Sequence, residues 1–298
     1  MSSEIAPNFL LIGASRCDTT SVARWLSAHP EVFVSRRKEV FYFSHQRNYA
    51  RGWSDYLKHF AGAEGFPARG EATTDYANTI KYPWVVDRIA RDIPACRLIY
   101  MVRHPLRRIE SQWQLVRSAG GFTGSLSEFV VNVPEALQMS RYATNYENYR
   151  KRFPPEQIKV VFFEDFALDP EAVARDVYRF LGVDAAISPA AVRRAENRSA
   201  AMRVRPAWSL RLRRHALSRY YHLFMPEIMK QFIHRRYTKE LQFNPVWSAD
   251  ALRYATNILL PEVQEFLPLW GRHPSTWSFD SGAMPSGAPK VDSGSPSS

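Results

Sequence analysis

Two stretches of the sequence combine arginine with hydroxyl side chains directly after an apolar run. The first is GASRCDTTS at 13–21, which follows the apolar residues 8–13 and precedes a helical pattern. Its polar side chains include Arg16, Thr19, Thr20 and Ser21. Together with the backbone N–H groups of a helix N-terminus, these side chains form a favourable place for an anion. The lysine spacing of a Walker loop is absent, and ordinary helix capping by Asp18 or Thr19 explains the same residues equally well.

The second stretch is RHPLRRIES at 103–111, which follows the apolar run 97–102. Arg103 stands at the end of that run, and Arg108 and Ser111 lie three residues apart, on one face of the predicted helix. A guanidinium beside a hydroxyl can bind a phosphate through charge-assisted hydrogen bonds. A surface cluster of arginines is the simpler alternative.

A third stretch, RRKEVFYF at 36–43, places Lys38 and Glu39 before several aromatic residues. Partial burial raises the pKa of a glutamate, which suits a general base. Lys38 opposes that shift and could instead stabilise a developing anion. An exposed Lys–Glu pair at a strand edge is the alternative for this stretch taken alone. His45 is a weaker base candidate, and His104 is expected to pack at the end of a strand.

Alternating strands and helices position these stretches. The predicted strands are 8–13, 31–34, 69–73, 97–102 and 157–163. The predicted helices are 19–29, 55–60, 83–92, 105–117, 142–153, 170–181 and 249–267. This order predicts an α/β fold with a parallel sheet flanked by helices. Ligands of such sheets bind at the carboxyl ends of the strands, which is where the first two stretches lie.

Composition narrows the class of protein. The 298 residues are 45% hydrophobic and 23% charged, which excludes a disordered, collagen-like or coiled-coil chain. No apolar run is long enough for a membrane span, no secretory signal is visible, and two cysteines fit a reducing compartment. We therefore expect a cytoplasmic protein. The expected domain organisation is one domain at 1–279 and a disordered Ser/Pro/Gly-rich tail at 280–298.

The net charge of +11 predicts an anionic partner. The segment 193–239 holds thirteen Lys and Arg against two Glu, so the rest of the chain is close to neutral. We expect the part of the chain after Asp184 to be mostly helical and basic. The basic segment fits contact with a membrane surface or a polyanionic acceptor, and a solvated helix face is the simpler alternative.

Taken together and in this order, the three stretches resemble the motifs of the sulfotransferase family that uses 3′-phosphoadenosine 5′-phosphosulfate (PAPS). The patterns are G-x-x-[KR]-x-G-T-T-[ST], R-x-P-x-x-R-x-x-S and the K-E-x-x-[FY]-F segment of the carbohydrate, or heparan sulfate, branch. Weaker similarities are GEATTDY at 70–76, which resembles G-E-[KA]-[ST]-P-x-Y, and ENRSAAMRVRP at 196–206, which resembles a late basic loop. The resemblance implies a P-loop-NTPase-like parallel sheet, as in bacterial members of the family.

The resemblance also implies roles for single residues. The 5′-phosphosulfate would be held by Arg16, Cys17, Asp18, Thr19, Thr20 and Ser21. The 3′-phosphate would be held by Arg103 and Ser111, with Arg203 and Arg205 closing over the nucleotide. Glu39 would be the general base, and Lys38 and Arg16 would stabilise charge on the transferring group. Lys38, Tyr76 and Tyr142 would line the acceptor cleft, although buried packing explains the tyrosines equally well. No metal is implied, and the product nucleotide would be 3′-phosphoadenosine 5′-phosphate (PAP).

The expected reaction is sulfuryl transfer to a hydroxyl or amine of a carbohydrate, glycolipid or small molecule. One departure from the pattern is Asp18, which stands where the family has glycine, and a second is Thr74 in place of proline. A carboxylate about 4 Å from a bound anion costs on the order of 4 kcal/mol before Arg16 offsets it. A nucleotide-binding or partner-binding protein without turnover is therefore the main alternative. A nucleic-acid-binding protein would fit the charge, but the sequence contains no nucleic-acid-binding motif. We therefore expect no nucleic acid to bind.

Overall fold

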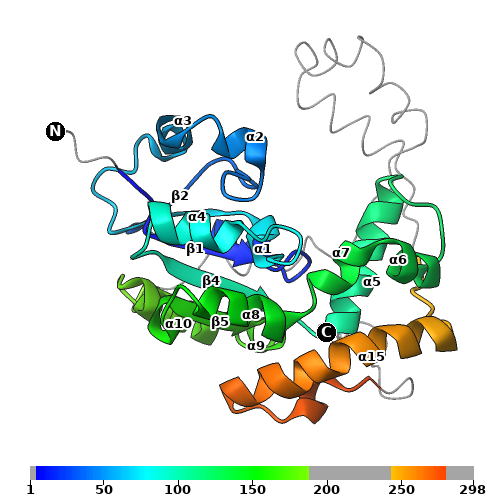
Figure 1. Ribbon diagram of the computed structural model, residues 1–298. Coiled ribbons are helices and arrows are strands. Elements are labelled where there is room, and N and C mark those ends of the chain that lie inside the picture. Colours follow the sequence, from blue (N-terminus) through cyan, green and yellow to red (C-terminus); the bar gives the residue numbers. More distant parts are fainter. Residues whose placement is uncertain (1–4, 188–242, 280–298) are drawn as a thin grey trace, which may run out of the picture.

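A parallel sheet with the strand order β2-β3-β1-β4-β5 forms the centre of the protein (Figure 1). The strands are β1 Phe9–Gly13, β2 Val32–Val34, β3 Ala68–Ala72, β4 Arg97–Val102 and β5 Ile158–Phe162. The computed structural model describes residues 5–187 and 243–279, and these share one hydrophobic core. The predicted parallel α/β architecture is confirmed, and each predicted strand lies within one or two residues of an observed one.

Helices flank the sheet, and local sequence explains where several of them begin and end. The α-helices up to β5 are α1 Thr19–Leu26, α2 Gln46–Tyr49, α3 Trp53–Leu57, α4 Val85–Asp92, α5 Pro105–Ser118, α6 Leu126–Asn132, α7 Pro134–Gln138 and α8 Tyr142–Arg150. The later ones are α9 Phe163–Leu168, α10 Pro170–Leu181 and α15 Ala249–Phe266. Proline at the first helical position begins α5 and α10, and Gly182 in the left-handed region ends α10. Helix α15, orange in Figure 1, packs against α6, α7 and α8.

The central strand β1 decides where a ligand can bind. All five residues of β1 are buried, as expected for a strand with neighbours on both sides. The chain runs from β1 to β2 and β3 on one side and then to β4 and β5 on the other, so the strand order reverses at β1. A crevice forms at such a reversal, outside the carboxyl ends of the strands. The segments 13–21, 73–77 and 103–111 leave the sheet at that edge.

Some predictions fall outside the described residues. These are Arg203, Arg205, the basic segment 193–239 and the tail 280–298. In the part of the chain that the structure describes, no helix is both long and apolar enough to cross a membrane.

Candidate active site

The loop after β1 approaches the rest of the sheet so closely that it needs glycine at its start. Gly13 has a φ of +132°, and a Cβ there would lie 2.7 Å from Ala77 Cβ and 2.8 Å from the Thr74 carbonyl oxygen. The next residue, Ala14, donates its N–H to the carbonyl of Met101 in β4. The start of the loop is thus fixed between the ends of β3 and β4.

Two loop residues, Arg16 and Asp18, lie in the left-handed region with φ of 72° and 61°. When successive residues alternate between right-handed and left-handed backbone conformations, their N–H groups point toward one place. Such an arrangement binds anions. The Asp18 side chain does not cap α1 but accepts a hydrogen bond from Ser21 Oγ at 2.7 Å. Capping of α1 by the Asp18 side chain, the alternative named above, is therefore wrong, and aspartate is among the residues that tolerate this left-handed conformation best.

The two arginine stretches meet in the structure. Arg16 Nε donates to Ser111 Oγ at 3.0 Å, and Arg103 Nη1 donates to the carbonyl oxygen of Arg16 at 3.4 Å. The Arg103 guanidinium also stacks on the Phe163 ring, with Cζ 4.4 Å from the ring centre. Residues 87 positions apart in the sequence therefore form one cationic cluster at the carboxyl ends of β1 and β4.

Arg108 has a different place from the one expected. Its side chain is fully buried, at 0% exposure, and therefore cannot share an exposed phosphate site with Ser111. It donates to neutral acceptors: Ser140 Oγ at 2.6 Å, Gln112 Oε1 at 2.8 Å, the Ser15 carbonyl at 3.5 Å and the Ala136 carbonyl. Because the C=O and N–H of one peptide point in opposite directions, holding the Ser15 carbonyl turns the Arg16 N–H away from Arg108.

The positive charges of Arg16, Arg103 and Arg108 are only partly offset, because the Asp18 carboxylate acts on Arg16 and the Glu164 carboxylate acts on Arg103 from beyond ion-pair distance. Within residues 5–187 and 243–279, no carboxylate forms an ion pair with any of the three. Burial, followed by the charges of Arg103 and Arg108, lowers the pKa of Arg16. Guanidinium groups bind phosphate through charge-assisted hydrogen bonds. A group of arginines that has no ion-paired carboxylate in the described residues, beside an anion-binding loop, fits a phosphorylated ligand.

The remaining residues predicted in the first loop take different positions. Cys17 and Thr19 are buried, Ser21 is half-buried and Thr20 is exposed. Burial raises the pKa of Cys17 to about 12, and the thiol faces the Ser15 carbonyl. The Cys17 thiol is therefore closed to a ligand, whereas Thr20 is exposed.

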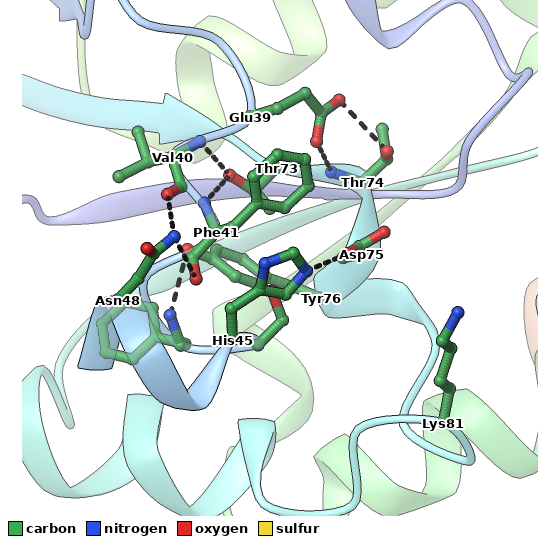
Figure 2. A network of polar contacts seen from close by, with 12 residues as sticks. Glu39, Val40, Phe41, His45, Asn48, Thr73, Thr74, Asp75, Tyr76 and Lys81 are labelled. Carbon is green, nitrogen blue, oxygen red and sulfur yellow. Dashed lines mark hydrogen bonds and ion pairs between the residues drawn. The ribbon is translucent and has the colours of Figure 1, made fainter. Parts of the chain in front are cut away.

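Glu39 lies near the same edge of the sheet, and Figure 2 shows its carboxylate held by Thr74. Its carboxylate accepts hydrogen bonds from the Thr74 N–H at 2.9 Å, from Thr74 Oγ1 at 3.1 Å and from Lys38 Nζ at 3.0 Å. The side chains of Lys38 and Glu39 remain 31% and 26% exposed, so both can meet a ligand. A proline at position 74 would have no N–H and no hydroxyl to donate. The two hydrogen bonds to Glu39 therefore depend on the threonine that this chain has at position 74.

Thr74 joins the two halves of the site. Its side chain and N–H contact Glu39, and its carbonyl lies where a Cβ on Gly13 would clash. The loop that begins at Gly13 and the carboxylate of Glu39 are therefore separated by a single residue in contact with both. This places a candidate base and a candidate anion site at one edge of the sheet.

Sequence reasoning missed a buried polar network beneath Glu39. Glu71 in β3 is 0% exposed and accepts hydrogen bonds from Thr73 Oγ1 at 2.5 Å, Tyr76 OH at 2.7 Å and Tyr56 OH at 3.3 Å. Burial raises the pKa of Glu71 to about 7, although the hydrogen bonds from Thr73 and the tyrosines act in the opposite direction. The available signal was Glu71 itself, a charged residue inside a predicted strand. A buried carboxylate needs hydrogen-bond donors, so its position indicated a polar network.

The two tyrosines predicted for the acceptor cleft are core residues. Tyr76 and Tyr142 are 0% and 1% exposed. Tyr142 OH donates to the Arg103 carbonyl at 2.8 Å, so it supports the loop after β4 from below. The burial of both rings contradicts direct contact with an acceptor and supports the packing alternative.

The histidines differ in their surroundings. His104 is largely buried, and its Nε2 lies 2.8 Å from the Ser278 carbonyl, in agreement with the expected packing at a strand end. His45 Nε2 lies 3.1 Å from Asp75 Oδ2, and the ring stacks on Phe41 with 4.6 Å between centres (Figure 2). The aromatic ring of Phe41, a residue of the turn 39–43, thus covers one face of the His45 ring. Within the described ranges, no group of three or more His, Cys, Asp or Glu side chains is arranged to hold a metal ion.

The sequence is similar to those of known sulfotransferases. The sequence matches the profile of a sulfotransferase family over residues 40–186, a range that includes Arg103 and Ser111 but begins one residue after Glu39. It is 27% identical over 200 residues to the human bifunctional heparan sulfate N-deacetylase/N-sulfotransferase 3, over 59% of this chain and 22% of that protein. It is 34% identical over 110 residues to the membrane-associated sulfotransferase kil1 of Dictyostelium discoideum, over 36% of this chain and 22% of that protein.

Two further comparisons cover a larger share of the protein with which this chain is compared. Mouse heparan sulfate glucosamine 3-O-sulfotransferase 5 is 25% identical over 194 residues, which span 61% of this chain and 55% of that protein. The first two relatives are matched over only 22% of their length. The crystal structure of a sulfotransferase from Alicyclobacillus acidocaldarius has a TM-score of 0.66 at 24% identity, over 91% of this chain and 98% of that chain. This similarity confirms the predicted α/β fold.

Proposed function

The chain belongs to the sulfotransferase family, and we propose that it transfers a sulfuryl group from PAPS to a hydroxyl or amine of an acceptor. The observation that carries the proposal is the cluster of Arg16, Arg103 and Arg108, which lacks an ion-paired carboxylate in the described part of the chain and adjoins an anion-binding loop. A nucleotide with phosphate groups at two positions supplies the missing negative charge. Relatives named for heparan sulfate support a carbohydrate acceptor.

In this proposal the cationic cluster binds the donor. Arg16 with the backbone of 13–21 holds the 5′ end, where the scissile bond lies, and Arg103 and Ser111 hold the 3′-phosphate. The hydrogen bond between Arg16 and Ser111 fixes the distance between these two subsites. The bound donor supplies an electrophilic sulfur whose bond to the 5′-phosphate oxygen breaks, with the electron pair leaving on the phosphate.

Glu39 activates the acceptor. Its carboxylate removes the proton from the acceptor hydroxyl or amine as the new bond to sulfur forms. Lys38, 3.0 Å from Glu39 Oε1, stabilises the negative charge that develops on the transferring group. Thr74 holds the carboxylate in one orientation through two hydrogen bonds. Positioning and fixed charges then account for most of the rate enhancement.

Calorimetric titration with PAP tests donor binding. Arg103→Met removes one charged ligand contact and should weaken PAP binding about 10- to 100-fold. Arg47→Met, which removes an exposed arginine of α2, is the matched control and should bind PAP like the wild type. Absence of PAP binding by the wild-type protein would refute the proposal.

Turnover with labelled PAPS and a panel of carbohydrate and small-molecule acceptors tests the chemistry. Glu39→Gln should lower kcat at least 100-fold while the Kd for PAP stays within about two-fold. A wild-type rate in that variant would show that Glu39 is not the base.

Binding without turnover is the second candidate, and Asp18 is the observation that favours it. The Asp18 carboxylate lies in the anion-binding loop, where it raises the pKa of Arg16 and so competes with a ligand anion. A wild-type protein that binds PAP but transfers no sulfuryl group, together with Asp18→Gly protein that does transfer it, would establish this candidate.

A further inference from the structure

A buried pair of residues, Glu71 and Thr73, connects to the turn that carries Glu39. Glu71 accepts hydrogen bonds from three hydroxyls, and two of them, those of Thr73 and Tyr76, belong to the segment after β3. Each of these two hydroxyls in turn accepts hydrogen bonds from the backbone of residues 40–43. Thr73 Oγ1 accepts from the N–H of Val40 at 3.0 Å and of Phe41 at 3.4 Å, and Tyr76 OH accepts from the N–H of Phe43 at 3.3 Å.

The turn needs such support because its backbone is strained. Glu39 and Phe41 both have positive φ, of 61° and 58°, a region that residues other than glycine rarely adopt. Figure 2 shows the Thr73 hydroxyl facing the two amide nitrogens, while the Glu39 carboxylate reaches Thr74. Asn48 holds the opposite side of the turn by donating Nδ2 to the Val40 carbonyl at 3.1 Å.

The direction of each hydrogen bond follows from Glu71. A hydroxyl has one hydrogen, and Thr73 gives its hydrogen to Glu71 Oε2 at 2.5 Å. Its lone pairs are then free to accept from Val40 and Phe41. Without an acceptor at Glu71 the hydroxyl would turn its hydrogen elsewhere, and the turn would lose a fixed partner.

We propose that Glu71, acting through Thr73, is a positioning residue that holds the Glu39 turn in the orientation needed for proton abstraction. Glu71 itself is fully buried and meets no substrate. The proposal rests on the proposed function, because it concerns the orientation of Glu39 as the base. In this proposal the segment 71–74 holds the base in two ways. Glu71 and Thr73 fix the backbone of the turn, and Thr74 binds the Glu39 carboxylate directly.

Thr73→Val is the sharpest variant, because it keeps the shape of the side chain and removes only the hydroxyl. We expect kcat with PAPS to fall about 10- to 100-fold, the loss typical of a misplaced catalytic group, while the KM for PAPS and the Kd for PAP change less than two-fold. Thr73→Ser keeps the hydroxyl and should recover most of the rate. Glu71→Gln, with only one acceptor oxygen, should also lower kcat.

Thr79→Val is the matched control. Thr79 is a buried threonine whose hydroxyl donates to Asn145 Oδ1 at 2.8 Å, away from the 39–43 turn. Its loss should lower stability and leave kcat within two-fold of the wild type. Equal losses of kcat in Thr73→Val and Thr79→Val would mean that the effect is general destabilisation, and would overturn the proposal.

Amide hydrogen exchange, followed by NMR on the full chain, provides a readout independent of activity. The Val40 and Phe41 amides should be protected in the wild type and in Thr73→Ser, and should exchange at least 10-fold faster in Thr73→Val. Unchanged exchange in Thr73→Val overturns the proposal whether or not the protein is active. A wild type that binds no PAP and shows no turnover overturns the proposed function instead, and the exchange rates still decide whether Thr73 holds the turn.

Discussion

Replacement of Glu71 by glutamine should change how the stability of the protein depends on pH. Glu71 is completely buried; it accepts hydrogen bonds from Tyr56 of α3, Tyr76 and Thr73, and its charge interacts with those of Glu39 and Cys96. Burial raises the pKa of Glu71 from 4.5 to about 7, against the opposing effect of three donated hydrogen bonds. The folded state thus binds a proton at this position more tightly than the unfolded chain does.

The sign and size of the effect follow from this difference. A group whose pKa is raised on folding contributes stability that is complete below pH 4.5 and is lost as the pH rises through about 7. Between pH 5 and pH 8, ionisation of Glu71 should lower the free energy of unfolding by about 2.5 kcal/mol. Above pH 8 no further change is expected from this group. Glu71→Gln carries no titrating group at this position, so the loss should be absent.

Urea unfolding at pH 5, 6, 7 and 8 measures this difference directly. Other titrating groups affect both proteins equally, so the wild-type curve minus the Glu71→Gln curve isolates Glu71. In thermal melts the same difference corresponds to about 5–10 °C in Tm. Parallel curves for the two proteins across this range would refute the assignment of Glu71 as a buried carboxylate that ionises near neutrality.

Three further predictions concern the cationic cluster. Asp18→Gly should bind PAP about 10-fold more tightly by calorimetry, because it removes a negative charge from the loop and because glycine adopts a φ of 61° without strain; weaker binding would show that the hydrogen bond from Ser21 matters more. Arg108→Met should lower the free energy of unfolding by about 3 kcal/mol in urea titrations, since it leaves buried acceptors such as Ser140 Oγ without a donor, and a stability equal to wild type would contradict this. The Kd for PAP should rise steeply as NaCl increases from 50 to 500 mM, because exposed charge attraction is screened by salt; a constant Kd would mean that charge contributes little to binding.

Much of the fold follows from the sequence, because its strands are short apolar runs bounded by turn residues. β1 and the part of β4 after Arg97 are buried on both faces, so their hydrophobicity is continuous, and β5 is interrupted only by the half-buried Lys159. Helices α6 and α7 were not predicted, although Ser125 and Glu128 form a capping box and Pro134 begins α7. Helix α9 follows β5 without an intervening loop, so no turn residue marks its beginning.

The site was predictable as a set of residues and only partly as an arrangement. Arg16 and Arg103 follow neighbouring strands, so their meeting at one edge follows from the topology. The bond between Arg16 and Ser111 depends on the left-handed backbone at Arg16, which no local pattern announces. The burial of Arg108 depends on Ala136 and Ser140, which belong to a part of the chain whose helices were not predicted.

The two halves of the site are electrostatically different, and the difference matches the two tasks that sulfuryl transfer requires. On the side proposed to bind the donor, the arginines donate to neutral acceptors and form no ion pair with a carboxylate in the described residues, which suits a ligand that carries several negative charges. On the acceptor side Glu39 is balanced by Lys38 and by two hydrogen bonds from Thr74, which orient the carboxylate without burying it. Gly13 lets the two halves approach, since any side chain there would collide with the Thr74 backbone. In the proposed mechanism, the anion-binding loop and the base are therefore held close together by Thr74, which contacts Glu39 and adjoins Gly13 at the junction of β1 and β3.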